Sequence, residues 1–354
     1  MKQVYIFTPF MTGYGGTETV LTNLFHEYNR SPERDYHMKL ICIGGYEDDS
    51  WTGSIKDIQV INLGKNRTIR ALVYLFCLPF IMLRILKGNP DVVISTNPIM
   101  WSLAYWIKAI FHKKYKVISW YHYSLEAKSL PKILLKSADT YLAISSGISH
   151  QIQKYGVHAE KIKTIFNPIF KNKIVVSRTE VGETPELIYV GRIMLDGQKN
   201  MRQIIDALAN VKGKWHLSIY GDGDIEAVSN YIDSKGISDN ISFMGFKKNM
   251  WSTLDKMDCL LLSSKYEGLP MVLNEAISVG IPVISTNCET GPEDIVNSEN
   301  GILVKTNSTL DYQQAIQKVV DRKVDFQDSI KIKKSISKFY SENYFNVFMK
   351  SIGE

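Results

Sequence analysis

The stretch Cys259–Ser285, CLLLSSKYEGLPMVLNEAISVGIPVIS, contains the unit from which the fold is predicted. It begins with an apolar run that ends at Ser263, and a second apolar run begins at Pro282. Between them, Pro270 follows a polar loop and suits the first turn of a helix, where its missing N–H leaves no hydrogen bond unmade. A strand, a helix and a second strand in this order predict a βαβ unit with parallel strands.

The same alternation extends from this unit toward both ends of the chain. In the N-terminal half the strand-like runs are Val4–Thr8, Met38–Ile43, Val92–Ser95, Lys116–Trp120, Tyr141–Ile144 and Lys163–Phe166. In the C-terminal half they are Leu187–Gly191, Trp215–Tyr220, Ile241–Met244, Cys259–Ser263, Pro282–Ser285 and Gly301–Val304. These runs are rich in Val, Ile and Leu, which is typical of strands buried on both faces. The sequence therefore predicts an α/β protein with parallel sheets.

The organisation into domains follows from length and from one break in the pattern. A chain of 354 residues favours about two domains. Residues 167–185 are polar with little periodicity, and they read as a linker. We expect an N-terminal domain over 1–167, a C-terminal domain over 168–334, and a final helix at about 335–354 that packs back on the N-terminal domain. Two doubly wound domains facing each other would place a ligand in a cleft between the carboxyl ends of their strands.

Composition excludes several classes of protein and shows an uneven charge. With 45% apolar and 22% charged residues, the chain is neither disordered nor collagen-like. Its four cysteines are scattered without C-x-x-C spacing, which indicates a reducing compartment. Residues 1–167 carry 20 Lys and Arg against 12 Asp and Glu, whereas the remainder carries 22 against 24. Residues 65–136 hold twelve cations and only two acids, which suggests an anionic partner, the alternative being an ordinary solvated surface.

One apolar segment lies inside this basic region. Ala71–Leu83 has thirteen residues without a charge, between Arg70 and Arg84. It is shorter than the roughly 20 residues that cross a bilayer. It is either a buried helix or a helix lying at a membrane surface, and the neighbouring cations favour the second. The first residues, MKQVYIFTPF, lack the apolar core of a signal peptide.

Three glycine-containing loops follow predicted strands. Gly13, Gly15 and Gly16 precede a helix, whose N-terminus could meet a phosphate. Gly191-Arg192 is followed seven residues later by Lys199, and two cations beyond a strand suit a diphosphate. Gly221-Asp222-Gly223-Asp224 is predicted as a β–α turn, with a metal-binding D-x-D pair as the alternative.

Two glutamates and one histidine complete the candidate site. Glu267 lies in the loop after its strand and Glu275 in the following helix, so two carboxylates flank a helix N-terminus. Carboxylates accept hydrogen bonds, as partners of sugar hydroxyls must. His122 lies between two tyrosines after a strand and is either a packed residue or a ligand contact.

The Glu267–Glu275 spacing with Gly268-Leu269-Pro270 between resembles the E-x7-E motif of the retaining glycosyltransferases of family four, which have the GT-B fold. Within that family the chain looks most similar to the lipopolysaccharide 1,6-galactosyltransferase group. The resemblance covers essentially the whole chain, at Gly16, His122, Asn167-Pro168, Gly191-Arg192 with Lys199, Gly221-Asp222-Gly223, and Glu267 with Glu275. The seven-residue spacing from Arg192 to Lys199 departs from the spacing of six in many members.

The resemblance implies a role for each matching residue. Arg192 and Lys199 would neutralise the donor diphosphate, and Glu275 would bind the ribose hydroxyls. Glu267 would bind a hydroxyl of the transferred sugar. From the N-terminal domain, His122 would contact the donor sugar and Gly16 would lie over the phosphates. Gly245 and Phe246 would contact the base. The N–H groups of Gly268 and Leu269 would lie near the sugar.

The resemblance also implies a reaction. We expect a retaining transferase that moves a hexose from a UDP-sugar to a bacterial envelope glycan or glycolipid, with galactose favoured and glucose and N-acetylglucosamine open. No cofactor, metal or nucleic acid is expected. Contact with an anionic membrane surface is expected, and this would place the protein in the cytoplasm on the inner face of the cell membrane. The alternatives are a non-hydrolysing UDP-sugar epimerase on the same fold and a nucleotide-sugar-binding protein without catalysis.

Overall fold

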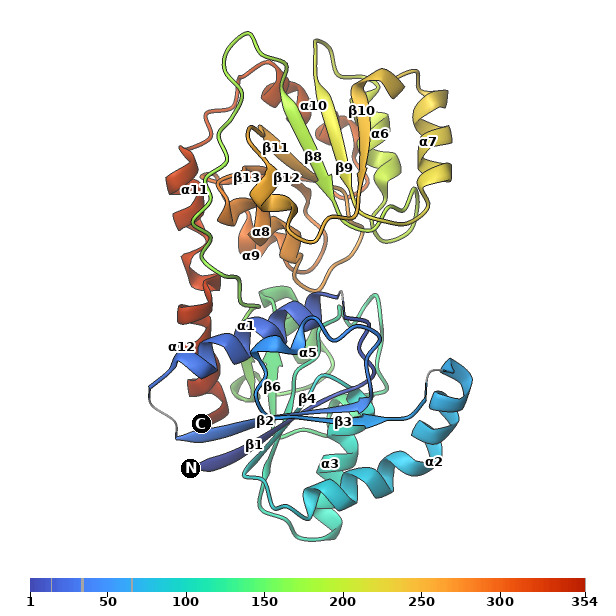
Figure 1. The fold of residues 1–354 in the computed structure, drawn as a ribbon, viewed down its shortest axis with the longest axis vertical. Helices are drawn as coiled ribbons and strands as arrows, with labels where there is room; N and C mark the ends of the chain where they lie inside the picture. The colour runs from blue at the N-terminus through green and yellow to red at the C-terminus, as the bar shows by residue number, and fades with distance from the viewer. Residues whose placement is uncertain (14, 33–34, 65, 354) are drawn as a thin grey trace. The chain divides into compact units, whose positions relative to one another are not determined.

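A computed structural model describes residues 1–13, 15–32, 35–64 and 66–353, and it divides into two compact units (Figure 1). The first unit contains Met1–Pro168 together with Ser341–Glu354, and the second contains Ile169–Tyr340. The expected boundaries were 167/168 and about 335. The division thus lies one residue further along at the first crossing and a few residues further along at the second.

The first unit is built on a seven-stranded parallel sheet in the order β3-β2-β1-β4-β5-β6-β7. Its strands are β1 Lys2–Thr8, β2 Tyr36–Gly44, β3 Ile58–Asn62, β4 Val92–Ser95, β5 Lys116–Ser119, β6 Thr140–Ala143 and β7 Ile162–Thr164. Its helices are α1 Gly16–Arg30, η1 Thr52–Ser54, α2 Arg67–Leu86, α3 Pro98–Ile110, α4 Lys132–Leu135, α5 Ser146–Lys154, η2 Ala159–Lys161 and α12 Ser341–Gly353. The sequence pattern missed β3, because this edge strand is short, half-exposed and interrupted by polar residues.

The second unit is built on a six-stranded parallel sheet in the order β10-β9-β8-β11-β12-β13. Its strands are β8 Glu186–Val190, β9 His216–Tyr220, β10 Ile241–Gly245, β11 Cys259–Leu262, β12 Val283–Thr286 and β13 Gly301–Val304. Its helices are α6 Met201–Leu208, α7 Ile225–Ser234, η3 Ser238–Asn240, η4 Met250–Thr253, α8 Met271–Ser278, α9 Pro292–Ile295, α10 Thr309–Val320, α11 Ser329–Ser335 and η5 Ser337–Phe339. The prediction of two parallel sheets is confirmed.

The segment expected as a linker packs along the second unit. Ser177 forms an isolated parallel bridge with Lys256, and the Val176 N–H donates to the carbonyl of Val279 at 2.8 Å. The hydroxyl of Thr179 donates to the Asp258 carboxylate at 2.7 Å, and Val176 is buried. These contacts fix the segment as part of the fold rather than as a free tether.

The final helix begins later than expected. Helix α11 ends at Ser335, and Tyr340 has extended backbone before α12 starts at Ser341. Helix α12 packs against α1, and the ring of Phe348 lies 5.5 Å from that of Trp120 after β5. The end of the chain therefore supplies part of the core of the first unit.

Helix α2 extends beyond the predicted apolar segment at both ends, and most of it is not buried. Its buried residues are Leu78, Met82 and Leu86. Within the described ranges it is the one helix that meets the length and composition of a membrane span, with 17% of its most apolar window buried. The buried-helix interpretation of Ala71–Leu83 therefore holds for one face only.

Candidate active site

Two neighbouring strands of the second unit carry the core of the candidate site. Strands β8 and β11 pair in parallel, so the loops that follow them emerge at the same edge of the sheet. These loops are hydrogen-bonded to each other: the Lys265 N–H donates to the carbonyl of Gln198 at 2.8 Å, and the Ser263 hydroxyl donates to that of Lys199 at 3.0 Å. The two motif segments are thereby held side by side.

This arrangement brings Lys199 and Glu267 into an ion pair. The Lys199 ammonium donates to Oε1 of Glu267 at 2.7 Å, with 17% and 10% of the two side chains exposed. The hydroxyl of Thr290 donates to the backbone carbonyl of Glu267 and fixes the same loop from the other side. A cation and a carboxylate are thus placed together before any ligand binds.

Glu275 lies on α8, close to this pair. Indole Nε1 of Trp251 donates to its Oε2 at 3.3 Å. Burial raises the pKa of the Glu275 carboxyl, while the Trp251 hydrogen bond and the Lys199 charge act in the opposite direction. A desolvated carboxylate that accepts one long hydrogen bond is stabilised when hydroxyl groups donate further hydrogen bonds to it.

Arg192 is positioned through its backbone. The hydroxyl of Tyr189, a buried residue of β8, donates to the Arg192 carbonyl at 2.7 Å. The Arg192 side chain is exposed, and among the described residues its guanidinium has no ion-pair or hydrogen-bond partner. A fixed backbone with an unengaged guanidinium suits an incoming anion.

The Gly221–Asp224 segment is a tight turn against the same loop. A Cβ on Gly221 would lie 1.9 Å from the carbonyl oxygen of Gly191, and one on Gly223 would lie 2.1 Å from that of Ile193. The Asp224 side chain caps α7 by accepting the N–H of Ala227 at 3.2 Å. These contacts account for both glycines and Asp224 as turn residues, as the sequence predicted. Within the described part of the chain, no group of three or more His, Cys, Asp or Glu is placed to hold a metal ion.

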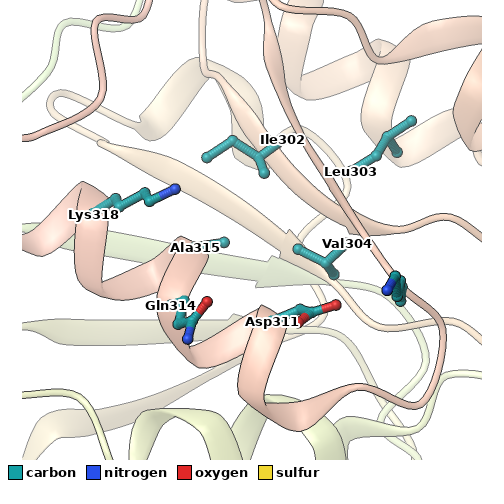
Figure 2. A pocket seen from close by; sticks show the side chains of 8 residues that line it. Ile302, Leu303, Val304, Asp311, Gln314, Ala315 and Lys318 are labelled. Atoms are coloured by element: carbon teal, nitrogen blue, oxygen red, sulfur yellow. The ribbon is translucent and has the colours of Figure 1, made fainter.

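The remaining predicted residues of this unit lie in loops at strand ends. Gly245 ends β10, and its carbonyl accepts the N–H of Gly221 at 3.1 Å; Phe246 follows it and is 56% exposed. Gly268 and Leu269 lie close to Gly291: a Cβ added to Gly291 would be 2.9 Å from the carbonyl oxygen of Gly268 and from Cα of Leu269. The pocket in Figure 2 involves none of these residues, since it lies between edge strand β13 and α10.

In the first unit, a carboxylate from the first turn of α1 binds the glycine-containing loop that follows β1. Gly16 begins α1, and Oε1 of the buried Glu18 accepts the Gly13 N–H at 3.0 Å and the Thr12 hydroxyl at 3.2 Å. The chain's own anion therefore binds the loop directly before the helix N-terminus at which a phosphate is expected. The expected contact of Gly16 with the phosphates of the sugar donor stays a prediction.

His122 lies just beyond β5, and its ring packs against an aromatic neighbour at an interplanar angle of 52°. Its ring is 4.9 Å from that of Trp120, and burial lowers its pKa from 6.5 to about 3. Its Nε2 is buried without a hydrogen-bond partner among the described residues. The imidazole is therefore neutral at physiological pH, and a sugar contact stays a prediction for it.

Sequence reasoning missed four side chains that shape these sites: Glu18, Tyr189, Trp251 and Thr290. Tyr189 and Thr290 act through backbone carbonyls, and no sequence spacing signals such a contact. Trp251 comes from a short 3₁₀ helix outside any motif. Glu18 had a signal, because a glutamate in the first turn of a helix often bonds back to preceding N–H groups.

Known proteins match the whole length of the chain. The sequence family described as "Glycosyltransferase Family 4" matches residues 14–171, and "Glycosyl transferases group 1" matches residues 184–322. The lipopolysaccharide 1,6-galactosyltransferase of Salmonella typhimurium is 32% identical over 349 residues, which cover 97% of this chain and 96% of that protein. The chain belongs to the family 4 glycosyltransferases. The Escherichia coli protein of the same name is also 32% identical, over 97% of this chain.

Solved structures agree with this assignment. The apo form of the lipopolysaccharide outer core galactosyltransferase WaaB has a TM-score of 0.87 and 31% identity, with 99% of each chain covered. Anabaena HepE in complex with UDP has a TM-score of 0.79 over the full length of both chains; at 15% identity it supports the fold alone. The GT-B fold predicted for this glycosyltransferase is confirmed.

Proposed function

We propose that this glycosyltransferase moves a hexose, with galactose favoured over glucose and N-acetylglucosamine, from a UDP-sugar to a bacterial envelope glycan or glycolipid with retention at the anomeric carbon. One observation carries the proposal: the Lys199–Glu267 ion pair, which joins the loops after β8 and β11, lies beside Glu275, and the loop of Lys199 also presents the unengaged Arg192. The relatives named as lipopolysaccharide galactosyltransferases support the choice of galactose and of an envelope acceptor.

The donor diphosphate is assigned to the two cations. Arg192 has no competing anion among the described residues, and Lys199 can share its ammonium between Glu267 and a phosphate oxygen. Negative charge grows on the diphosphate as the bond to the sugar breaks, so these cations stabilise the transition state more than the bound donor. Glu275 is assigned to the ribose hydroxyls, whose donors would offset its desolvation.

The transferred sugar and the base are assigned to the neighbouring loops. Glu267 would accept a sugar hydroxyl, with the N–H groups of Gly268 and Leu269 nearby, and Gly245 and Phe246 would contact the base. From the first unit, His122 would contact the sugar and Gly16 the phosphates. A neutral His122 can donate or accept one hydrogen bond but is a poor general acid.

The ion pair also bears on how retention is achieved. A double displacement needs a carboxylate nucleophile. Glu267 is held by Lys199, which lowers its nucleophilicity, and no other carboxylate stands out. We assign front-face transfer, which the resemblance to family four implies: the acceptor oxygen bonds to the anomeric carbon as the bond to phosphate breaks. The bonding electrons leave with UDP, and a phosphate oxygen takes the hydroxyl proton.

No metal or other cofactor is assigned to this reaction, because Arg192 and Lys199 supply the positive charge that the diphosphate requires. We place the enzyme in the cytoplasm at the inner face of the cell membrane, in contact with its anionic surface. The basic segment 65–136 supports this location. Nucleic acid is not assigned as a partner.

The test is a donor and acceptor screen with the purified full chain. UDP-galactose, UDP-glucose and UDP-N-acetylglucosamine are each incubated with and without a lipopolysaccharide core acceptor. Released UDP is measured, and the anomeric configuration of the product is read by NMR. Acceptor-dependent UDP release with an α-linked product supports the proposal. Interconversion of the sugar without acceptor would instead establish the epimerase, and an inverted product would exclude front-face transfer.

A further inference from the structure

Helix α2 of the first unit has two apolar faces. Leu78, Met82 and Leu86, spaced by four residues, form the buried face. A second row, at spacings of three, four and four, is exposed to solvent: Ile69 at 56%, Leu72 at 53%, Phe76 at 67% and Phe80 at 73%. At about 100° per residue, Leu78 and Phe80 are about 200° apart, so the two rows lie on opposite sides of the helix. We call Ile69, Leu72, Phe76 and Phe80 the outer stripe.

The outer stripe is flanked by cations. Arg67 precedes it and Arg84 and Lys87 follow it, all three exposed and without a salt-bridge or hydrogen-bond partner among the described residues. Arg70 instead stacks over the ring of Phe10 at 3.6 Å. The sequence from Arg67 to Pro90 contains no acidic residue. An apolar face with cations at both ends matches the boundary between acyl chains and anionic headgroups.

The topology excludes a transmembrane position for this helix in the folded unit. Helix α2 connects β3 to β4, and both strands are parallel members of one sheet. Both ends of α2 therefore return to the same sheet. With its inner row packed in the core, the helix can present the outer stripe to a bilayer only by lying along its surface.

A second copy of the chain fits this surface less well. In a two-fold contact through the outer stripe, the cationic ends of the two helices would lie close together, and no residue from Arg67 to Pro90 supplies a compensating carboxylate. Like charges in such contact are unfavourable. A lipid surface supplies both the apolar layer and the negative charge.

We propose that α2 is the membrane-docking element of this enzyme, inserting its outer stripe into the interface of an anionic bilayer while Arg67, Arg84 and Lys87 bind lipid phosphates. This inference deepens the proposed location at an anionic membrane by assigning that contact to one helix, and it does not depend on the proposed sugar transfer. Some cations of the basic segment 65–136 are engaged within the protein. The Lys108 ammonium pairs with the Asp139 carboxylate at 2.6 Å, and the Lys113 ammonium donates to the side-chain oxygen of Asn89 at 2.8 Å.

The test is cosedimentation with vesicles of phosphatidylethanolamine and phosphatidylglycerol, compared with phosphatidylcholine alone. The variant F76E/F80E should bind the anionic vesicles about tenfold or more weakly, since a buried phenylalanine contributes at least that much. The matched control is L310E/I330E, which changes two side chains of the second unit that are 63% and 58% exposed and should bind like the wild type. Changing Arg67, Arg84 and Lys87 to Gln should remove most of the salt dependence.

A second readout uses Cys77, which lies on α2 and is exposed, while the other described cysteines, Cys42, Cys259 and Cys288, are buried. A polarity-sensitive fluorophore on Cys77 should shift to the blue with anionic vesicles. Thermal unfolding and the thermal shift caused by UDP should be unchanged in F76E/F80E, which separates this inference from the assigned active site.

Three outcomes would overturn the proposal: no binding by the wild type, equal binding by wild type and F76E/F80E, or equal binding to neutral and anionic vesicles. Dimers that form in the wild type and are lost in F76E/F80E, without vesicle binding, would assign the outer stripe to a second copy. Failure of sugar transfer in the donor screen would leave the vesicle result standing, so the two proposals fail separately.

Discussion

The two units share a sheet order but differ in the charge at corresponding loops. In the first unit the central strands run β3-β2-β1-β4, and in the second β10-β9-β8-β11. The loop after β1 surrounds the buried carboxylate of Glu18. The loop after β8, at the corresponding place, carries Arg192 and Lys199. One fold position thus holds an anion in one unit and two cations in the other.

This difference shows that topology determines where a loop lies and side chains determine what it binds. The loop of the second unit suits the anionic ligand proposed above, because hydrogen bonds within the unit fix the backbone at Arg192 and Lys199. The first unit offers the neutral His122 and a carboxylate at the same edge, groups suited to hydroxyls rather than phosphates. The predictions below test this division, beginning with the largest expected effect.

The substitutions Arg192→Ala and Glu275→Ala should each lower turnover about 100- to 1,000-fold, because each removes a group that stabilises charge or orientation at the reacting centre. Steady-state UDP release measures the effect. Arg202→Ala is the matched control, since Arg202 forms an exposed ion pair with Asp196 at 2.8 Å in the same unit and should keep near-normal turnover. Near-normal turnover of either test variant, with a folded circular dichroism spectrum, would remove that residue from the site.

Breaking the Lys199–Glu267 pair should affect both stability and binding. Lys199→Met leaves a mostly buried carboxylate without its cation, and Glu267→Gln removes the charge that holds the lysine. Each should lower the free energy of unfolding by about 1–3 kcal/mol. In urea titrations the double variant should lose clearly less than the sum of the single variants. Additive losses would show that the pair is not coupled in solution.

Glu18→Gln should destabilise the first unit by about 1 kcal/mol, because a charge-assisted hydrogen bond to the Gly13 N–H becomes a neutral one. The exposed Glu47, changed to Gln, is the control and should have little effect. UDP affinity should not increase in Glu18→Gln. A clear gain in a calorimetric titration would mean that the carboxylate competes with a phosphate, and the contrast between the two loops would fail.

The raised pKa of Glu275 predicts a pH dependence of stability. Between the ordinary glutamate pKa and the raised value in the folded state, the folded protein binds more protons than the unfolded chain. Stability contributed by this group therefore falls as pH rises through that window. Glu275→Gln should be slightly more stable than the wild type at neutral pH and similar in acid, as read from melting temperatures across pH. A wild type more stable than this variant at neutral pH would contradict the desolvation argument.

Chelation should have the smallest effect. If Arg192 and Lys199 neutralise the diphosphate, UDP release should be unchanged by EDTA and by added manganese. Loss of turnover in EDTA that manganese restores would make Asp222 and Asp224 a candidate ligand pair again, despite the capping role of Asp224.

Much of the fold was predictable because the central strands, such as β4, β11 and β12, are apolar and buried along their whole length, as continuous runs of Val, Ile and Leu indicate. The exception, β3, lies at an edge, where one side of the strand is unpaired and polar residues such as Gln59 are tolerated. The composition of α2 was readable, but not which of its faces is buried, because both faces carry the same kinds of side chain.

The candidate site was predictable only where a motif lies within one loop. The close spacing of Glu267 and Glu275 was visible in the sequence. The contact between Lys199 and Glu267 depends on the pairing of β8 with β11, which are far apart in the chain. Trp251 reaches Glu275 from a 3₁₀ turn that has no sequence signature.

The first unit is discontinuous, and this has a consequence during synthesis. Domains commonly fold as they leave the ribosome, from the N-terminus onward. Here residues 1–168 emerge long before α12. The contact between the rings of Trp120 and Phe348 therefore cannot form until the whole second unit has been translated. Until then the nascent first unit exposes the surface of α1 that α12 later covers. Chaperones that bind apolar segments have their longest access to this chain at that surface, and a ribosome stalled within the second unit would hold the first one incomplete.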